Sequence, residues 1–363
     1  MDKFIQNEYL PDVVSPPGDS LLEIIEGRGM SQAELSERTG RPKKTINEIV
    51  KGKAAITPAT ALRLERVLGA PASFWNDREQ HYRESLARQA ERNSLQGQVD
   101  WLNQFPIKTM VEFGWLPAGD DPVEMLRNVI SFFGIASPIQ WHEIWQKPGV
   151  AFRKSPAFES DPFAISVWIR RGEIEAQQID CQPYDADRFI TALHSIRTLT
   201  MQLPENFYQE IVRLCASAGV AVVFMPQLPK VRVSGATRWL TPTKAMLQVS
   251  IRYKTDDQLW FSFFHEAGHI LKHGKRDIFI EGNGDGNEKE AEAHRFAADF
   301  LLPPSEYRQF KPRGKYYSKA EIVEFARQLG IAPGIVVGRL QHDGKLPNKN
   351  CNDLKRALRW ADH

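Results

Sequence analysis

Two histidines and a glutamate stand close together in the segment His-Glu-Ala-Gly-His, residues 265–269. Residues four apart share one face of a helix, so the imidazoles of His265 and His269 can bind one cation together. Glu266 lies beside a ligand without having to be one, and its carboxylate can hold a metal-bound water and accept its proton. The motif is flanked by apolar residues that favour a dry site, namely Phe261, Phe263, Phe264, Ile270 and Leu271. The segment therefore predicts a hydrolytic metal centre on a helix.

A catalytic zinc needs a third protein ligand and an open fourth position. The helical segment 287–302 offers four candidate groups, Glu288, Glu290, Glu292 and His294. Its apolar face runs through Ala293, Phe296, Phe300 and Leu301. Glu288 and Glu292 border that face, and periodicity leaves both open as the third ligand.

The HExxH motif, followed about twenty residues later by an EAxxFAxxxLxP segment, resembles the ImmA/IrrE family of bacterial metallo-endopeptidases. The resemblance implies that Glu292 completes the metal site with His265 and His269, and that Glu266 is the general base of a thermolysin-like reaction. Zinc is the expected metal and manganese the alternative. His294 stands where the family has asparagine, and we expect either an ordinary packed histidine or a group that assists the ligands or the transition state.

The donor that would stabilise the oxyanion is not apparent from the sequence. Arg252, Tyr253 and His294 are candidates because they lie near the motif. His273, one turn beyond His269, is expected to be structural. The polar loop 281–287 lies between the two ligand-bearing segments, and we expect it to gate the cleft.

An N-terminal segment, residues 30–69, resembles the Xre-type helix-turn-helix of phage repressors and is closest to the HigA-type antitoxin variety. The resemblance implies that Gln32 contacts a phosphate and that residues 41–50 form a recognition helix in the major groove. The expected DNA-contacting residues are Gln32, Arg41, Lys43, Lys44, Thr45, Asn47, Lys51 and Lys53. From Arg38 to Lys53 six basic residues stand against one acidic residue, a net charge of +5 that suits phosphate binding. The alternative is a helical bundle that only dimerises.

The whole chain has 363 residues, of which 42% are hydrophobic and 25% charged, and these values are typical of a globular protein with two or three domains. The fold class expected is a multidomain, mainly α protein with a small α+β zincin-like metallopeptidase domain and an all-α helix-turn-helix domain at the N-terminus. The expected divisions are a flexible tail (1–14), the helix-turn-helix domain (15–90), a helical middle region (91–203), the peptidase domain (204–310) and a C-terminal helical segment (311–363).

Local patterns predict several elements. Ser31 is an expected N-cap, with Glu34 completing a capping box. Further helices are expected at 122–133, 186–199, 205–218, 256–273, 287–302, 318–329 and 333–342. Strands are expected at 219–226, 231–240, 245–252 and 277–280.

The three cysteines are far apart, which favours a reducing cytoplasm. The net charge of +2 gives no global indication of partners, and neither a membrane span nor a signal peptide is expected. The expected function is a DNA-binding regulator with an endopeptidase that cleaves a repressor, an antitoxin or itself. Expected partners are a double-stranded DNA operator, that protein substrate, a toxin and a second copy in a homodimer. The alternative is an antitoxin-like repressor whose metallopeptidase fold is a non-catalytic sensor or scaffold.

Overall fold

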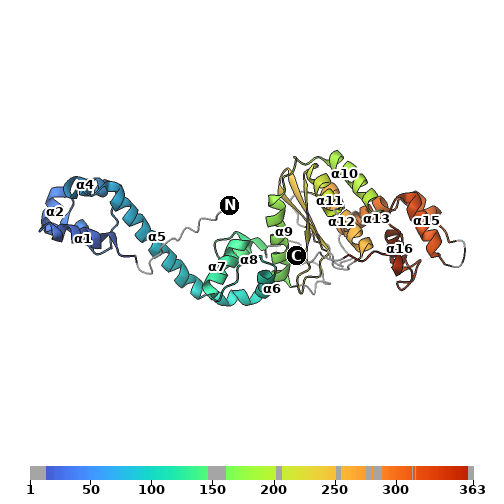
Figure 1. Cartoon of the computed structure of the whole chain (residues 1–363), viewed down its shortest axis with the longest axis horizontal. Coiled ribbons are helices and arrows are strands. Elements are labelled where there is room, and N and C mark those ends of the chain that lie inside the picture. Colours follow the sequence, from blue (N-terminus) through green and yellow to red (C-terminus); the bar gives the residue numbers. More distant parts are fainter. Residues whose placement is uncertain are drawn as a thin grey trace, which may run out of the picture. The chain divides into compact units, whose positions relative to one another are not determined.

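The chain forms two compact units, Met1–Val99 and Asp100–His363 (Figure 1). The computed structural model describes residues 14–145, 161–201, 207–250, 255–274, 279–280, 288–312, 314 and 316–358. The predicted divisions at residues 203 and 310 fall inside the second unit. Residues 100–203 of the predicted middle region and the C-terminal helices lie in the same unit as the HExxH segment, while residues 91–99 lie in the first unit.

The first unit is a bundle of five helices: α1 (Pro17–Gly27), α2 (Gln32–Thr39), α3 (Lys43–Val50), α4 (Pro58–Leu68) and α5 (Ala72–Gln96). Their apolar faces meet in a buried core that includes Leu21, Leu35, Ile46, Leu64 and Trp75. Ser31 and Thr57 cap α2 and α4 with their side chains. The predicted N-cap at Ser31 is thus confirmed. The Glu34 carboxylate accepts hydrogen bonds from Arg38, so only the Ser31 half of the predicted capping box is seen here.

Helices α1 and α3 approach each other closely at Gly18. A Cβ atom at that position would lie 2.2 Å from the Ile49 carbonyl oxygen. Only glycine fits there without a shift of the backbone. This contact holds α3 against the rest of the bundle.

The second unit contains the remaining elements. Before the sheet come η1 (Val99–Gln104), α6 (Ile107–Glu112), α7 (Pro122–Phe133), α8 (Pro138–Trp145), α9 (Pro162–Gln178), α10 (Ala186–Leu199) and α11 (Phe207–Ala216). The strands are β1 (Val220–Met225), β2 (Gly235–Thr241), β3 (Lys244–Ser250) and β4 (Phe279–Ile280). The other helices are α12 (Asp256–Lys272), α13 (Glu288–Leu301), α14 (Pro304–Gln309), α15 (Lys319–Leu329), α16 (Pro333–His342) and η3 (Asn352–Leu354).

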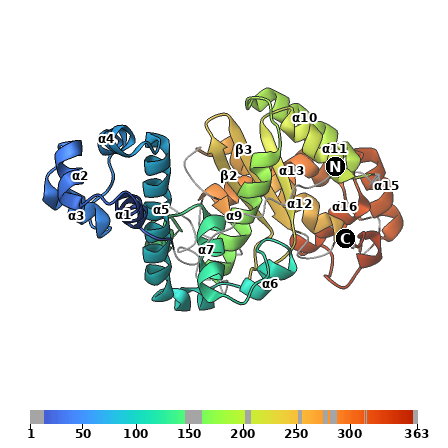
Figure 2. The same ribbon diagram turned by 60° about the vertical axis from the view of Figure 1, so that its left-hand side comes forward.

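The strands form one sheet in the order β1-β3-β2-β4. Strand β1 pairs with β3 in parallel, while β2 pairs antiparallel with both β3 and β4. Successive side chains of a strand face opposite sides. On β3, Leu247 and Val249 join the core that contains α12, whereas Gln248 donates to the Trp168 carbonyl of α9. Helices α12 and α9 therefore cover opposite faces of the sheet, and Figure 2 shows α9 crossing one of them.

Arginines tie distant helices of this unit together. Arg197 of α10 donates to the carbonyl oxygens of Leu301 and Leu329, which end α13 and α15. Arg356 donates to the Thr200 and Met201 carbonyls just after α10. These charged caps satisfy helix C-termini that would otherwise lack partners.

The predicted fold class is confirmed: the chain is a mainly helical multidomain protein with a small sheet and an N-terminal helical domain. None of the helices in the described part of the chain is long and apolar enough to cross a membrane.

Candidate metal centre and DNA-binding helices

Helix α12 carries the HExxH residues at the centre of the second unit. His265, Glu266 and His269 are all essentially inaccessible to solvent. The Nε2 atoms of the two histidines lie 3.0 Å apart, on the face that α13 covers. The i, i+4 spacing therefore brings the two imidazoles together as predicted.

The carboxylate that meets this pair is Glu290. Its Oε2 lies 3.2 Å from His265 Nε2, and its Oε1 lies 3.4 Å from His269 Nε2. Glu292 has a half-exposed side chain and contacts His273 Nε2 at 3.3 Å. Glu288 is exposed. The geometry therefore favours Glu290 over the expected ligand Glu292.

The helical repeat of α13 explains this difference. Ala293, Ala297 and Leu301 form the buried face of the helix. Glu290 lies three residues before Ala293 and so shares that face, whereas Glu292 is adjacent to Ala293 and turned about 100° away. The i, i+3, i+7 spacing of Glu290 with the two alanines was the signal in the sequence that could have identified it.

Small residues allow the two ligand-bearing helices to approach. A Cβ atom on Gly268 of α12 would lie 3.3 Å from Ala293 Cα and 3.0 Å from the Phe296 ring. Gly268 lies one residue before His269, and Ala293 lies three residues after Glu290. It sets the separation between the imidazoles and the carboxylate.

Electrostatics prepare His269 and Glu290 to bind a cation. Burial lowers the pKa of His269 to about 4, although Glu290 opposes this change. Burial alone would raise the pKa of Glu290, but hydrogen bonds to His265 and His269 outweigh it and lower that pKa to about 2. At neutral pH the site thus offers one carboxylate and an imidazole, His269, that is uncharged. Metal binding needs these deprotonated forms.

The spacing of the donor atoms fits a divalent metal. Two nitrogen ligands about 2.05 Å from a tetrahedral zinc lie about 3.3 Å apart. The three separations between the donor atoms here run from 3.0 to 3.4 Å. His265, His269 and Glu290 are therefore suited to bind one ion.

Glu266 points from α12 toward β2. Its Oε2 accepts a hydrogen bond of 2.5 Å from the Thr237 hydroxyl. A Cβ atom on Gly235 would lie 2.6 Å from Glu266 Oε1 and Cγ, so the glycine leaves the space that this side chain fills. Neither of these β2 residues was predictable from the sequence, because no local pattern links them to Glu266; Thr237 is 29 positions away from it along the chain.

His294 lies beside the candidate ligands. Its ring centroid is 4.4 Å from that of His265, and its Nδ1 is 2.9 Å from the Glu290 carbonyl oxygen. Donor atoms of His265, Glu290 and His294 all lie within 4.8 Å of one another. The other two oxyanion candidates, Arg252 and Tyr253, and the expected gating loop 281–287 lie outside the described residues.

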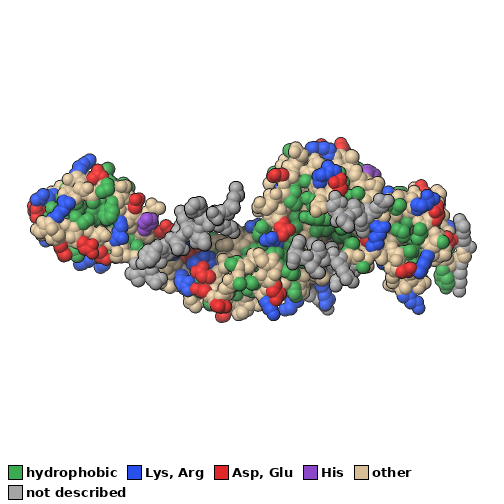
Figure 3. Space-filling model, in the orientation of Figure 1, with side chains coloured by type: hydrophobic (Ala, Val, Ile, Leu, Met, Phe, Trp, Pro, Cys, Tyr) green, Lys and Arg blue, Asp and Glu red, His purple; other side chains and the backbone are tan. Residues whose placement is uncertain are grey.

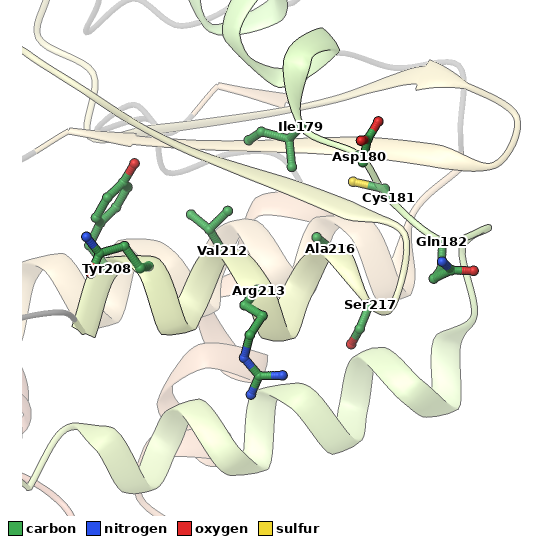
Figure 4. A pocket seen from close by; sticks show the side chains of 10 residues that line it. Ile179, Asp180, Cys181, Gln182, Tyr208, Val212, Arg213, Ala216 and Ser217 are labelled. Carbon is green, nitrogen blue, oxygen red and sulfur yellow. The ribbon is translucent and has the colours of Figure 1, made fainter.

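A separate pocket of about 500 Å³ lies between α11 and the segment that follows α9 (Figure 4). Val212 and Ala216 point toward Ile179 and Cys181 across it, while Arg213 points away. Arg213 is engaged in two hydrogen bonds with Glu210. The lining contains none of the HExxH residues, so this pocket is not the metal centre.

In the first unit, the side chains of Gln32 on α2 and Asn47 on α3 contact each other. The Asn47 amide donates to Gln32 Oε1 at 3.3 Å. Four lysines of the predicted interface are exposed, Lys43, Lys44, Lys51 and Lys53, while Gln32, Arg41, Thr45 and Asn47 are partly buried. On the face of this unit that Figure 3 shows, acidic and basic side chains are interspersed. The positive charge is thus a local feature of α3 and the turn after it.

Family models match one segment in each of the two units. Residues 21–75 match a helix-turn-helix model, and residues 215–341 match the model of the IrrE N-terminal-like domain. The chain combines a helix-turn-helix domain with an IrrE-like domain. This confirms the family resemblance found in the sequence. The IrrE-like match runs from α11 to α16 and contains all the candidate ligands, and helix-turn-helix domains are DNA-binding modules.

Solved structures share similarity with about a quarter of the chain. An addiction module antidote protein of the HigA family from Coxiella burnetii is 26% identical, with a TM-score of 0.22, and the match covers 23% of this chain and 92% of that chain. The antitoxin HigA from Pseudomonas aeruginosa, solved with the higBA promoter, is also 26% identical, with a TM-score of 0.22 and coverage of 23% and 90%. No curated protein sequence matches this chain significantly.

Proposed function

We propose that this chain is a DNA-binding regulator whose second unit is a metal-dependent endopeptidase that cleaves a regulatory protein, either a repressor or antitoxin or the chain itself. One observation carries the enzymatic part. The donor atoms of His265, His269 and Glu290 converge beside the buried carboxylate of Glu266. Burying a carboxylate that is not a ligand is costly, and a purely structural metal site has no use for it.

The chemistry follows from the donor set. Zinc is the metal that two imidazoles and one carboxylate favour, with manganese as the alternative. A divalent ion held by His265, His269 and Glu290 supplies Lewis-acid polarisation of a peptide carbonyl and of a water molecule. Glu266 holds that water, accepts its proton and delivers the proton to the leaving amine. Thr237 keeps the Glu266 carboxylate in place by its hydrogen bond.

In our proposal the first unit binds the DNA that the protein regulates. In our proposal α3 enters the major groove of an operator, with the exposed lysines on phosphates and Gln32, Arg41, Thr45 and Asn47 completing the interface. We propose a homodimer on an inverted repeat, because helix-turn-helix modules commonly bind two half-sites. A toxin is a further proposed partner of such a regulator.

Co-expression tests the peptidase proposal. Wild type and Glu266→Gln are each expressed with regulators encoded beside the gene, and each regulator is followed by immunoblotting. We expect one regulator to be cleaved by wild type only, because the amide of the glutamine variant cannot accept the proton of the water. Equal cleavage by the two forms would exclude Glu266 as the base.

His294 supports one alternative, a regulator whose metal site is closed. Four protein ligands are the mark of structural zinc sites, and His294 lies within 4.8 Å of His265 and Glu290. Under this alternative the wild-type protein binds metal and DNA but cleaves none of the regulators encoded beside its gene. His294→Asn, which restores the residue expected from the family resemblance, would then open the site and produce cleavage.

A further inference from the structure

Three side chains, those of His269, His273 and Glu292, form a chain of hydrogen bonds that leads from the metal site to the surface. His269 Nδ1 lies 2.9 Å from His273 Nδ1, and His273 Nε2 lies 3.3 Å from Glu292 Oε2. The His273 side chain is 3% exposed and that of Glu292 is 49% exposed. The chain begins on the nitrogen of His269 that does not face Glu290.

The direction of each hydrogen bond follows from the role of His269. To bind a metal through Nε2, its ring must carry its hydrogen on Nδ1. That N–H then donates to His273 Nδ1, which must hold a lone pair. The hydrogen of His273 is therefore on Nε2, where it donates to the Glu292 carboxylate. All three groups are satisfied in this single arrangement.

Packing holds the two rings in this arrangement. The Phe279 ring of β4 stacks on His269 with centroids 4.3 Å apart and planes 16° apart. It also lies 5.1 Å from the ring of His273. His273 is the first residue beyond α12, and its extended backbone turns the ring back toward His269, one turn earlier. The pair thus has little freedom to rotate.

We propose that His273 and Glu292 position His269 for metal binding, so that hydrogen bonds to an imidazole and from it to a carboxylate fix the orientation of this ligand and keep its hydrogen on Nδ1. The inference rests on the metal centre of the proposed function. Partners of this kind on ligating histidines typically change metal affinity by about 10–100-fold. The inference also assigns a role to Glu292, which lies too far round α13 to meet the imidazole pair itself.

Two substitutions of His273 by residues of similar shape test the proposal. Asparagine and leucine have nearly the same shape, but only the asparagine oxygen can accept the His269 Nδ1–H. We compare wild type, His273→Asn and His273→Leu by titrating the full chain with Zn²⁺ against a chromogenic chelator at neutral pH. We expect His273→Leu to bind Zn²⁺ about 10–100-fold more weakly and His273→Asn to bind like wild type.

Position 292 provides a second matched comparison at a half-exposed residue, where folding is not at risk. Glu292→Gln keeps an acceptor for His273 Nε2–H, whereas Glu292→Leu removes it. We expect the leucine variant to lose about tenfold in Zn²⁺ affinity and the glutamine variant to retain it. Thermal melts of the metal-free proteins verify that each variant is folded.

The outcomes separate the two proposals. Wild-type affinity in both leucine variants, or equal losses in the asparagine and leucine variants, would overturn the positioning role while leaving the metal centre intact. If wild type and His265→Ala bind Zn²⁺ equally weakly, the metal centre itself is wrong. A ¹⁵N spectrum of the Zn²⁺-loaded protein gives a second reading, because the proposal requires the hydrogen of His269 to be on Nδ1.

Discussion

The buried hydroxyl of Thr237 donates a hydrogen bond of 2.5 Å to the proposed base, Glu266. We predict that Thr237→Val lowers kcat by about 10–100-fold for cleavage of the regulator found by co-expression, because small misplacements of a catalytic group have effects of that size. Valine keeps the shape of threonine and removes the donor. Thr237→Ser should recover most of the activity. Zn²⁺ affinity should be the same in all three proteins, and a parallel loss of affinity would mean that the substitution disturbs the metal site instead.

At the same residue scale, the ligand set shows what a local pattern can predict. His265 and His269 lie on one helix, so the spacing along the chain fixes their relation, and the structure brings them together as expected. The third carboxylate comes from another helix, and its choice depends on which face of α13 is buried. The apolar face was expected to run through Ala293, Phe296, Phe300 and Leu301, but the buried residues of α13 are Ala293, Ala297 and Leu301. Phe296 and Phe300 are only partly buried.

At the scale of elements, the contact between α12 and α13 depends on Gly268. We predict that Gly268→Val forces the helices apart, because a branched side chain would overlap Ala293 and Phe296. Overpacking of this kind costs about 1–3 kcal/mol, and Glu290 would move away from the imidazoles. Thermal melting and Zn²⁺ titration should both register the change. Gly274→Val is the matched control, since a Cβ atom there meets no atom within 4 Å; equal effects of the two substitutions would contradict the explanation.

Elements with their own local signals were predictable. The helices Pro122–Phe133 and Pro333–His342 agree residue for residue, because each begins with proline at its first position. The packing of α9 on the sheet was not predictable. It depends on Glu173, which bonds Arg170 on its own helix and Arg238 on β2, and on Gly172, where a Cβ atom would overlap Gln248. Such pairings between distant segments leave no periodic pattern in either one.

At the scale of the whole molecule, each unit has a hydrophobic core of its own. The DNA-binding and metal-binding activities should therefore be separable. We predict that removing the metal with a chelator leaves the operator affinity of the full chain unchanged, as measured by fluorescence anisotropy. A fall in affinity that Zn²⁺ restores would show instead that the metal site controls DNA binding.

The second prediction at this scale concerns the proposed DNA-binding surface. Lys43 and Lys44 are exposed on α3, so each contact with a phosphate should release a counterion. The double variant Lys43→Ala/Lys44→Ala should therefore bind operator DNA more weakly and reduce the slope of log K against log salt by about 1 for each lysine. The control Arg88→Ala/Lys108→Ala removes the same charge from exposed positions outside α2 and α3. If the control weakens binding as much, the effect is one of net charge; if neither changes it, the bundle only dimerises. Only a selective effect of the α3 pair supports α3 as the recognition helix.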